Sequence, residues 1–271
     1  MELAIFLHHV MECAREQGQT LPQALAWVKS LGYDRVEAGF DDVPDPAALR
    51  RQLDDAGLGV SSVYAFFDWG KHPEDQRNFA LLDTADALGS SLVMPIPGFY
   101  AENGQPQEEN ERFLEGMQRM AEEAQKRGLI PTIEPFDNAR SPIATVAGME
   151  RFFSRVSNLA VTLDTGNFRF SGEDVLWAQQ VFRGRIRHVH LKDRLLTQPQ
   201  GMPMENSLKT PAGEVLWPCA VGDGDLPIRK VIDDLMADGY DHILSIEHFG
   251  AADWKTTIAH SMENVKAMLG A

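Results

Sequence analysis

Cysteine is scarce in this sequence of 271 residues, which contains only Cys13 and Cys219. The two lie far apart in the chain, and no Cys-x-x-Cys pair is present. This excludes a disulfide-rich scaffold and a Cys-x-x-Cys metal or redox motif. Two reduced thiols are typical of a cytoplasmic protein, and we predict that location.

Long hydrophobic runs are also missing. The first apolar run, Leu3–Leu7, ends at His8 and His9. It is too short for the apolar part of a secretion signal, and far shorter than the roughly 20 residues of a membrane-spanning helix. We therefore expect neither a membrane-spanning segment nor a membrane partner.

Basic residues are outnumbered, with 25 Lys and Arg against 40 Asp and Glu, which gives a net charge of -15. This balance argues against a nucleic-acid partner, because phosphate backbones are bound mainly by clustered Lys and Arg. The 44% of hydrophobic residues provides ample material for a core. Since α/β barrels of about 250 residues commonly form one unit, we expect a single domain over residues 1–271.

Short apolar segments recur along the whole chain. They are rich in Val, Ile, Leu or Phe, which is typical of buried parallel strands. There are eight, at Leu3–Leu7, Arg35–Phe40, Val60–Phe66, Ser91–Ile96, Leu129–Glu134, Ala160–Asp164, Ile186–Leu191 and His242–Glu247.

Helical patterns separate these segments. Thr20 to Gln23 forms a capping-box pattern, Asp45-Pro46 opens the next helix, and Gly57 closes it. Further helices are expected near 75–88, 108–127, 144–156, 173–182, 227–238 and 253–269. Eight strand-then-helix units predict an α/β fold, a (β/α)8 TIM barrel. An open doubly wound sheet is the alternative, but no GxGxxG turn follows the first strand.

The longest segment without a regular pattern runs from about Lys192 to Pro227. Long connections in compact domains are usually functional or mobile. Because this one follows the seventh strand, we expect it at the rim where barrel enzymes carry their active sites.

Four predicted strands end in residues that bind metals. These residues are Glu134, Asp164, His190 and Glu247, on the fifth to eighth strands. A carboxylate that closes an apolar strand is costly unless it is paired or coordinated, so convergence on one cation explains all four. The alternatives are separate rim ion pairs, or His188 as the ligand in place of His190.

Three carboxylates and one imidazole suit Mn²⁺, Mg²⁺, Co²⁺ or Zn²⁺, with coordination positions left for substrate oxygens. The ligand set does not choose among these metals. We take one divalent ion as the predicted cofactor and Mn²⁺ as the preferred metal.

Several strings resemble the xylose-isomerase-like barrels, in particular the sugar and sugar-phosphate isomerases and epimerases. They are Ile-Glu-Pro-Phe at 133–136, Leu-Asp-Thr-Gly-Asn at 163–167, His-Val-His-Leu-Lys-Asp at 188–193, Ser-Ile-Glu-His-Phe at 245–249, and the stretches 32–37 and 222–227. The resemblance implies a metal held by Glu134, Asp164, His190 and Glu247, with Glu134 and Glu247 also acting as catalytic proton-transfer groups.

Two departures from the family pattern concern the substrate. Ketose 3-epimerases of this family often have His where this chain has Asn167, and a histidine often found at the third strand end is absent from residues 66–69.

The resemblance also implies a reaction. The substrate is a ketose-like hydroxy-ketone, free or phosphorylated, which loses a proton next to its carbonyl to give an enediolate. Return of the proton makes the enzyme an isomerase or epimerase. The nearest alternative is an inosose (keto-cyclitol) dehydratase, which expels a hydroxyl with Lys192 or a histidine as the acid.

Two other classes fit less well. A DNA-repair endonuclease of the same superfamily needs further histidines, where this chain has Asp68, Met94-Pro95 and Asn167. A non-catalytic sugar-binding barrel does not need the intact set of four ligands.

Further residues are candidates for substrate binding. They are Lys192 (alternatively paired with Asp193), Glu37 (which orients a substrate or a group that supports the site, alternatively in a structural ion pair), one of His8 and His9, Asn167, His188 and Arg194. The expected partner is a small carbohydrate. Barrels of this kind often form dimers or tetramers, which leaves a homo-oligomer open.

Overall fold

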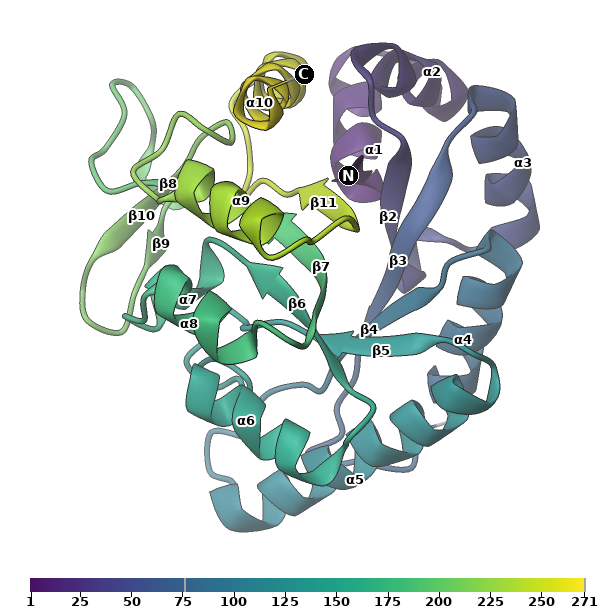
Figure 1. Cartoon of the computed structure of the whole chain (residues 1–271), viewed down its shortest axis with the longest axis vertical. Helices are drawn as coiled ribbons and strands as arrows, with labels where there is room; N and C mark the ends of the chain where they lie inside the picture. Colours follow the sequence, from purple (N-terminus) through teal and green to yellow (C-terminus); the bar gives the residue numbers. More distant parts are fainter. Residues whose placement is uncertain (76, 271) are drawn as a thin grey trace.

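A computed structural model describes residues 1–75 and 77–270 and contains a closed barrel of parallel strands (Figure 1). The barrel order is β1-β11-β7-β6-β5-β4-β3-β2, and each strand overlaps one of the predicted apolar segments. The (β/α)8 fold predicted from the sequence is therefore confirmed. The strands are β1 Glu2–Phe6, β2 Arg35–Gly39, β3 Gly59–Phe66, β4 Leu92–Ile96, β5 Ile130–Ile133, β6 Ala160–Asp164, β7 Ile186–Leu191 and β11 Ile243–Ile246.

The helices surround the barrel on its outside (Figure 1). Thr20 and Gln23 form the predicted capping box of α2, and Asp45 and Gly57 bound α3, where Gly57 has φ of 71°. Residue 76 of the helix predicted near 75–88 and residue 271 of the predicted domain lie outside the described residues. The helices are α1 Leu7–Glu16, α2 Leu21–Leu31, α3 Pro46–Ala56, α4 Arg77–Leu88, α5 Pro106–Lys126, α6 Val146–Arg155, α7 Asn167–Phe170, α8 Val175–Phe182, α9 Ile228–Ala237 and α10 Trp254–Leu269, with 3-10 turns η1 Phe40–Asp42 and η2 Met204–Asn206.

The first strand is shorter than predicted. Strand β1 ends at Phe6, and α1 begins at once with Leu7. His8 and His9 therefore lie on a helix, and the alternation of side chains along a strand does not decide which of them points inward. His9 is buried, whereas the side chain of His8 is 50% exposed.

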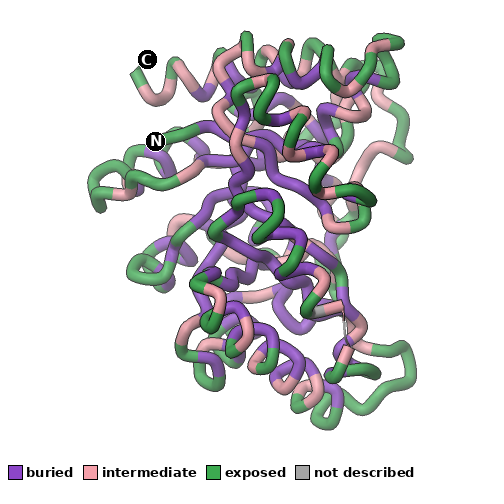
Figure 2. The backbone as a smooth tube through the Cα atoms, turned by 90° about the vertical axis from the view of Figure 1, so that its right-hand side faces the viewer, coloured by how far each residue is buried: buried purple, intermediate pink, exposed green. Residues whose placement is uncertain are grey.

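The main hydrophobic core lies between the barrel strands and the helices, and the strands form the buried centre in Figure 2. Polar side chains are also buried among the strands. Thr162 donates to Thr132 at 2.8 Å, and His188 and His190 on β7 are fully buried. These polar strand residues bring hydrogen-bonding chemistry into the centre of the protein.

The segment expected to be irregular, residues 192–227, contains a small antiparallel sheet. Its strands are β8 Arg194–Leu195, β9 Leu208–Lys209 and β10 Val215–Pro218, in the order β8-β10-β9. The side chain of Asp193 accepts hydrogen bonds from the backbone amides of Gly222, Gly224 and Leu226. These contacts join the end of β7 to the loop that precedes α9.

No described helix combines the length and the apolar character that crossing a membrane requires.

Candidate metal centre

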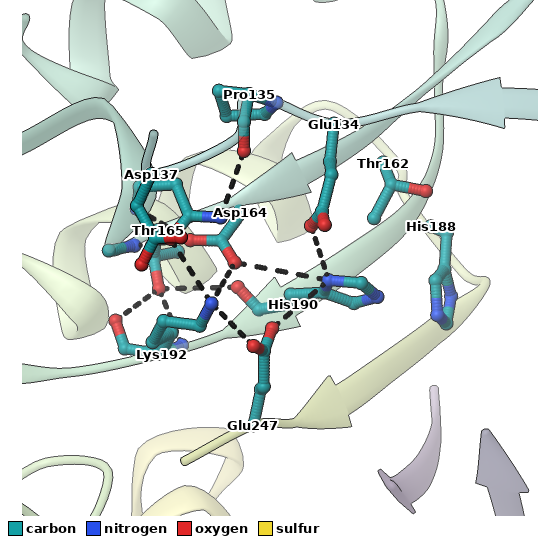
Figure 3. A network of polar contacts seen from close by, with 12 residues as sticks. Glu134, Pro135, Asp137, Thr162, Asp164, Thr165, His188, His190, Lys192 and Glu247 are labelled. Atoms are coloured by element: carbon teal, nitrogen blue, oxygen red, sulfur yellow. Dashed lines mark hydrogen bonds and ion pairs between the residues drawn. The ribbon is translucent and has the colours of Figure 1, made fainter. Parts of the chain in front are cut away.

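The four predicted ligands come together at the carboxyl ends of adjacent strands (Figure 3). Asp164 ends β6 and His190 lies near the end of β7, while Glu134 and Glu247 directly follow β5 and β11. One ligand atom from each residue lies within 4.8 Å of one atom from every other. Consecutive strand ends thus supply three carboxylates and one imidazole to one small volume.

The side chain of His190 lies at the centre of this cluster. Its Nδ1 is 2.8 Å from Glu134 Oε2, 3.3 Å from Glu247 Oε2 and 3.9 Å from Asp164 Oδ2. His190 and Asp164 are fully buried, and Glu134 is nearly so. All three carboxylates therefore face the same ring nitrogen in surroundings that exclude most water.

The bonding of Asp164 fits a metal ligand. Its Oδ1 accepts the backbone amides of Gly166 and Asn167, each at 2.7 Å, which fixes the carboxylate. Its Oδ2 accepts no well-aligned hydrogen bond, and neither does Oε2 of Glu247. Each oxygen has a cationic or imidazole nitrogen nearby, Lys192 Nζ at 3.1 Å from Asp164 Oδ2 and His190 Nδ1 at 3.3 Å from Glu247 Oε2, but both oxygens keep lone pairs that a divalent cation could use.

Further polar contacts lie on the other side of the His190 ring. Its Nε2 is 3.1 Å from both oxygens of Glu37, and Glu37 Oε2 is also 2.7 Å from Nε2 of His188. All three side chains are fully buried. Glu37 thus orients His190 from within the barrel. His188 pairs with Glu37, and its ring meets that of His190 edge-on with the centroids 5.1 Å apart.

The side chain of Lys192 also joins the cluster. Its Nζ lies 3.1 Å from Asp164 Oδ2 and 3.1 Å from Asn167 Oδ1, and it contacts Glu247. The alternative pairing with Asp193 is wrong, because the Asp193 carboxylate is occupied by backbone amides. The glycine at position 166 leaves room for the side chain of Lys192, because a Cβ at Gly166 would lie only 2.9 Å from Lys192 Cγ.

The pKa values reflect this crowding of charge. Burial, more than its acidic neighbours, raises the pKa of Asp164 to about 7 and also raises the pKa of Glu134. Burial opposes ionisation of Glu247 as well, but Lys192 and His190 hold its pKa well below the usual range. Burial would lower the pKa of Lys192, but the nearby Asp164 and Glu247 raise it. Burial and the neighbouring charges therefore shift the pKa values of these carboxylates in opposite directions within one cluster.

A cavity of about 200 Å³ opens onto the cluster. Five of the residues predicted to bind metal or substrate line it, namely His8, Glu134, Asn167, Lys192 and Glu247. A hollow of about 330 Å³ beside α8 contains none of the four clustered residues, so we place the site at the smaller cavity.

Three predicted substrate-binding residues do not line this cavity. Glu37 and His188 are enclosed in the barrel, and Arg194 is fully buried behind Asp137, to which its Nη2 donates at 3.1 Å. The predictions that these three bind substrate directly are therefore not supported by their positions.

Asp137 lines the cavity and was missed, whereas His9, predicted as an alternative to His8, lines the cavity together with His8. His9 stacks on Phe6 and Trp254, and its Nε2 accepts the backbone amide of His248 at 3.0 Å. Asp137 follows Glu134 by three residues and lines the cavity. Its place just beyond the end of β5 was the available signal, because barrel active sites lie at such strand ends.

The fold and this cluster define the class of protein: a (β/α)8 barrel with a buried cluster of acidic and histidine side chains at the carboxyl ends of its strands. A model of the family described as xylose isomerase-like TIM barrel matches residues 25–268. The chain belongs to that family.

Curated relatives and solved structures are similar over most of the chain. The inosose dehydratase of Lacticaseibacillus casei is 25% identical over 246 residues, covering 84% of this chain and 82% of the relative. An L-ribulose 3-epimerase structure superposes with a TM-score of 0.75 at 19% identity, covering 100% of this chain and 95% of the other. The IOLI protein, solved with a bound zinc atom, has a TM-score of 0.74 at 18% identity, covering 99% and 96%. At these identities the two structures support the fold alone.

Proposed function

We propose that this protein is a metal-dependent enzyme that removes the proton next to the carbonyl of a polyhydroxy ketone, a small carbohydrate. One observation carries the proposal: Glu134, Asp164, His190 and Glu247 converge, and two of them, Glu134 and Glu247, line a cavity of about 200 Å³. The cavity is small, because drug-sized ligands usually occupy about 300–1,000 Å³.

These four residues are the proposed ligands of one divalent ion, with Mn²⁺ preferred. When bound, such an ion supplies Lewis-acid chemistry, polarising a carbonyl and stabilising negative charge on the oxygens of an enediolate. Glu134 and Glu247 both line the cavity, so a carboxylate is available to take the proton from the carbon next to the carbonyl.

Expulsion of a hydroxyl from the neighbouring carbon is the first candidate for the second step. The enediolate re-forms its carbonyl, its C=C bond shifts toward the carbon that carries the departing hydroxyl, and that C–O bond breaks. Lys192 gives its proton to the hydroxyl, so the products are water and a hydroxy-enone. The ammonium of Lys192 is suitably placed, because it contacts Glu247 and lines the cavity. The inosose dehydratases among the relatives support this outcome, a lyase acting on a keto-cyclitol.

Isomerisation or epimerisation, the main prediction from the sequence, is the second candidate. Here the proton returns to the other face of the same carbon or to the neighbouring carbon. Glu134 and Glu247 both line the cavity, so two carboxylates are available to a ketone bound there. This arrangement favours a transfer that needs both a base and an acid.

The test begins with the metal content of the purified protein. Mn²⁺-loaded protein is then incubated with ketoses and inososes in D2O, and exchange at carbon is followed by NMR. We expect exchange in the wild-type protein and its loss in Glu134→Gln and Glu247→Gln. Glu109→Gln, which changes a buried glutamate that binds the amide of Ala101, is the matched control and retains exchange.

The products separate the two candidates. A mass lower by one water identifies the dehydratase, whereas an unchanged mass with a new sugar identifies the isomerase or epimerase. A protein that stays empty when Mn²⁺, Mg²⁺, Co²⁺ or Zn²⁺ is supplied contradicts the whole proposal.

A further inference from the structure

The guanidinium of Arg194 is hidden from the cavity. Arg194 is fully buried, its Nη2 donates to Asp137 Oδ2 at 3.1 Å, and its guanidinium carbon lies 4.3 Å from the centroid of the Phe249 ring. Asp137 lines the cavity and its side chain is 16% exposed. A ligand in the cavity therefore meets the carboxylate of Asp137 first, with the arginine behind it.

The carboxylates of the cluster are nearly balanced by cations. The proposed divalent ion together with the ammonium of Lys192 would offset Glu134, Asp164 and Glu247, while Glu37 pairs with His188 and His190 inside the barrel. Arg194 likewise offsets Asp137. Of the described residues that line the cavity, Lys192 is the single lysine or arginine, and it already contacts Glu247. A phosphate or carboxylate on the substrate would thus be an uncompensated buried charge, which is costly.

The other residues that line the cavity suit an uncharged ligand. Tyr64, Phe66, Phe136 and Phe249 contribute aromatic side chains, and Met94 and Ile96 add aliphatic surface. Such a wall packs against the C–H face of a sugar or cyclitol ring, while the metal and the polar groups take its oxygens. A cavity of about 200 Å³ fits a monosaccharide-sized molecule.

We propose that the cavity selects an uncharged, unphosphorylated polyhydroxy ketone, and that Asp137 determines this specificity by screening Arg194. The inference rests on the proposed function, because it names the substrate class of that same site. Selection by a repulsive group is a general route to specificity.

Arg194 also provides the means to reverse this preference. Its Nε and Nη1 make no hydrogen bond among the described residues, so the arginine retains donors for an anion. Asp137→Asn keeps the size of the side chain and removes its charge. In this variant Arg194 becomes an unpaired cation next to the cavity, and an anionic ketone gains a partner.

The experiment compares dihydroxyacetone with dihydroxyacetone phosphate, which differ only in the phosphate. Exchange of their carbon-bound protons in D2O is measured with the Mn²⁺-loaded full chain. We expect kcat/KM of the wild-type protein to favour dihydroxyacetone by about tenfold or more, since like charges across an interface are strongly unfavourable. Asp137→Asn shifts the ratio toward the phosphate ester by about tenfold or more. The double variant Asp137→Asn with Arg194→Met loses that shift.

Equal use of the two ketones by the wild-type protein overturns the inference, even if Asp137→Asn fails to fold. A folded Asp137→Asn whose ratio does not move overturns the role of Asp137. In both cases metal binding and exchange with dihydroxyacetone leave the proposed function intact. A protein that takes up no metal overturns the proposed function, and the inference with it.

Discussion

The carboxylate of Glu37 lies 3.1 Å from Nε2 of His190, on the side of the ring opposite to Glu134, which lies 2.8 Å from Nδ1. If His190 bound the proposed metal through Nδ1, its proton would remain on Nε2 and be donated to Glu37. Carboxylates that hold a ligand histidine in this way fix its orientation and its tautomer. Glu37 also contacts His188, so a fully buried chain of three polar side chains supports one ligand.

Glu37→Gln should therefore weaken metal binding. Loss of such a supporting carboxylate typically lowers metal affinity by about 10- to 100-fold. Competition with a coloured chelator measures the affinity directly, without any assay of activity. Glu109→Gln is the matched control for removal of a buried carboxylate elsewhere. An affinity unchanged in Glu37→Gln would contradict the supporting role.

Lys192→Met should separate the two steps of the proposed dehydration. The substitution removes the acid, so product formation falls by about 100-fold or more. Metal content and proton exchange persist, because the carboxylates remain. Lys230→Met, which removes a surface lysine paired with Asp234, is the control. Equal losses of exchange and of product would place Lys192 in the first step instead.

His9 should make the protein less stable in acid. Burial, followed by the nearby His248, His8 and Lys192, lowers the pKa of His9 well below its usual value, although Glu247 opposes the shift. Below about pH 6.5, His9 is protonated in the unfolded chain but stays neutral in the folded protein. The free energy of unfolding therefore falls by about 1 kcal/mol for each further pH unit. The contribution of His9 to the free energy of unfolding is therefore fully present above that pH and is lost as the pH falls below it.

His9→Gln keeps an acceptor for the amide of His248 and removes the titration. Urea unfolding of both proteins at about pH 7.5 and about pH 5.5 should show a smaller loss in the variant. Parallel losses in the two proteins would show that other groups account for the acid sensitivity.

Gly116→Ala should destabilise the fold. Gly116 lies on α5, and a Cβ at this position would come within 2.4 Å of Trp69 Cγ, in a fully buried ring. Overpacking of this kind costs about 1–3 kcal/mol. Thermal unfolding measures the effect, with Gly184→Ala as the control, because a Cβ there meets nothing within 4 Å. Similar melting temperatures for the two variants would mean that the Trp69 ring moves aside freely.

The sequence predicted the barrel and the four clustered residues for one physical reason. Each ligand ends an apolar strand, and parallel strands of a barrel bring such ends together. To predict Asp164, His190 and the two glutamates, it was therefore enough to know where the strands end. Lys192 was also proposed as a candidate, although its contacts with Asp164 and Glu247 were not predicted.

Other features depend on distances across the barrel that periodicity does not contain. Glu37 on β2 meets His190 on β7 although β1 and β11 separate these strands in the sheet. Asp137 and Arg194 are likewise far apart in the chain and meet only in the folded protein. The helix start at Leu7 was missed because the residue before it, Phe6, makes no side-chain cap.

Asp193 has a consequence for how this protein can change over evolution. Its carboxylate ties the loop before α9 to the end of β7, so both ends of the segment that contains β8, β9 and β10 are anchored at one point. Residues near Met204 at the far part of this segment are exposed. Insertions and deletions there leave the strand that carries His190 in place. The exposed turn near Met204 is therefore the part of this segment that can vary in length, while Arg194 on β8 and the clustered residues at the strand ends keep their places.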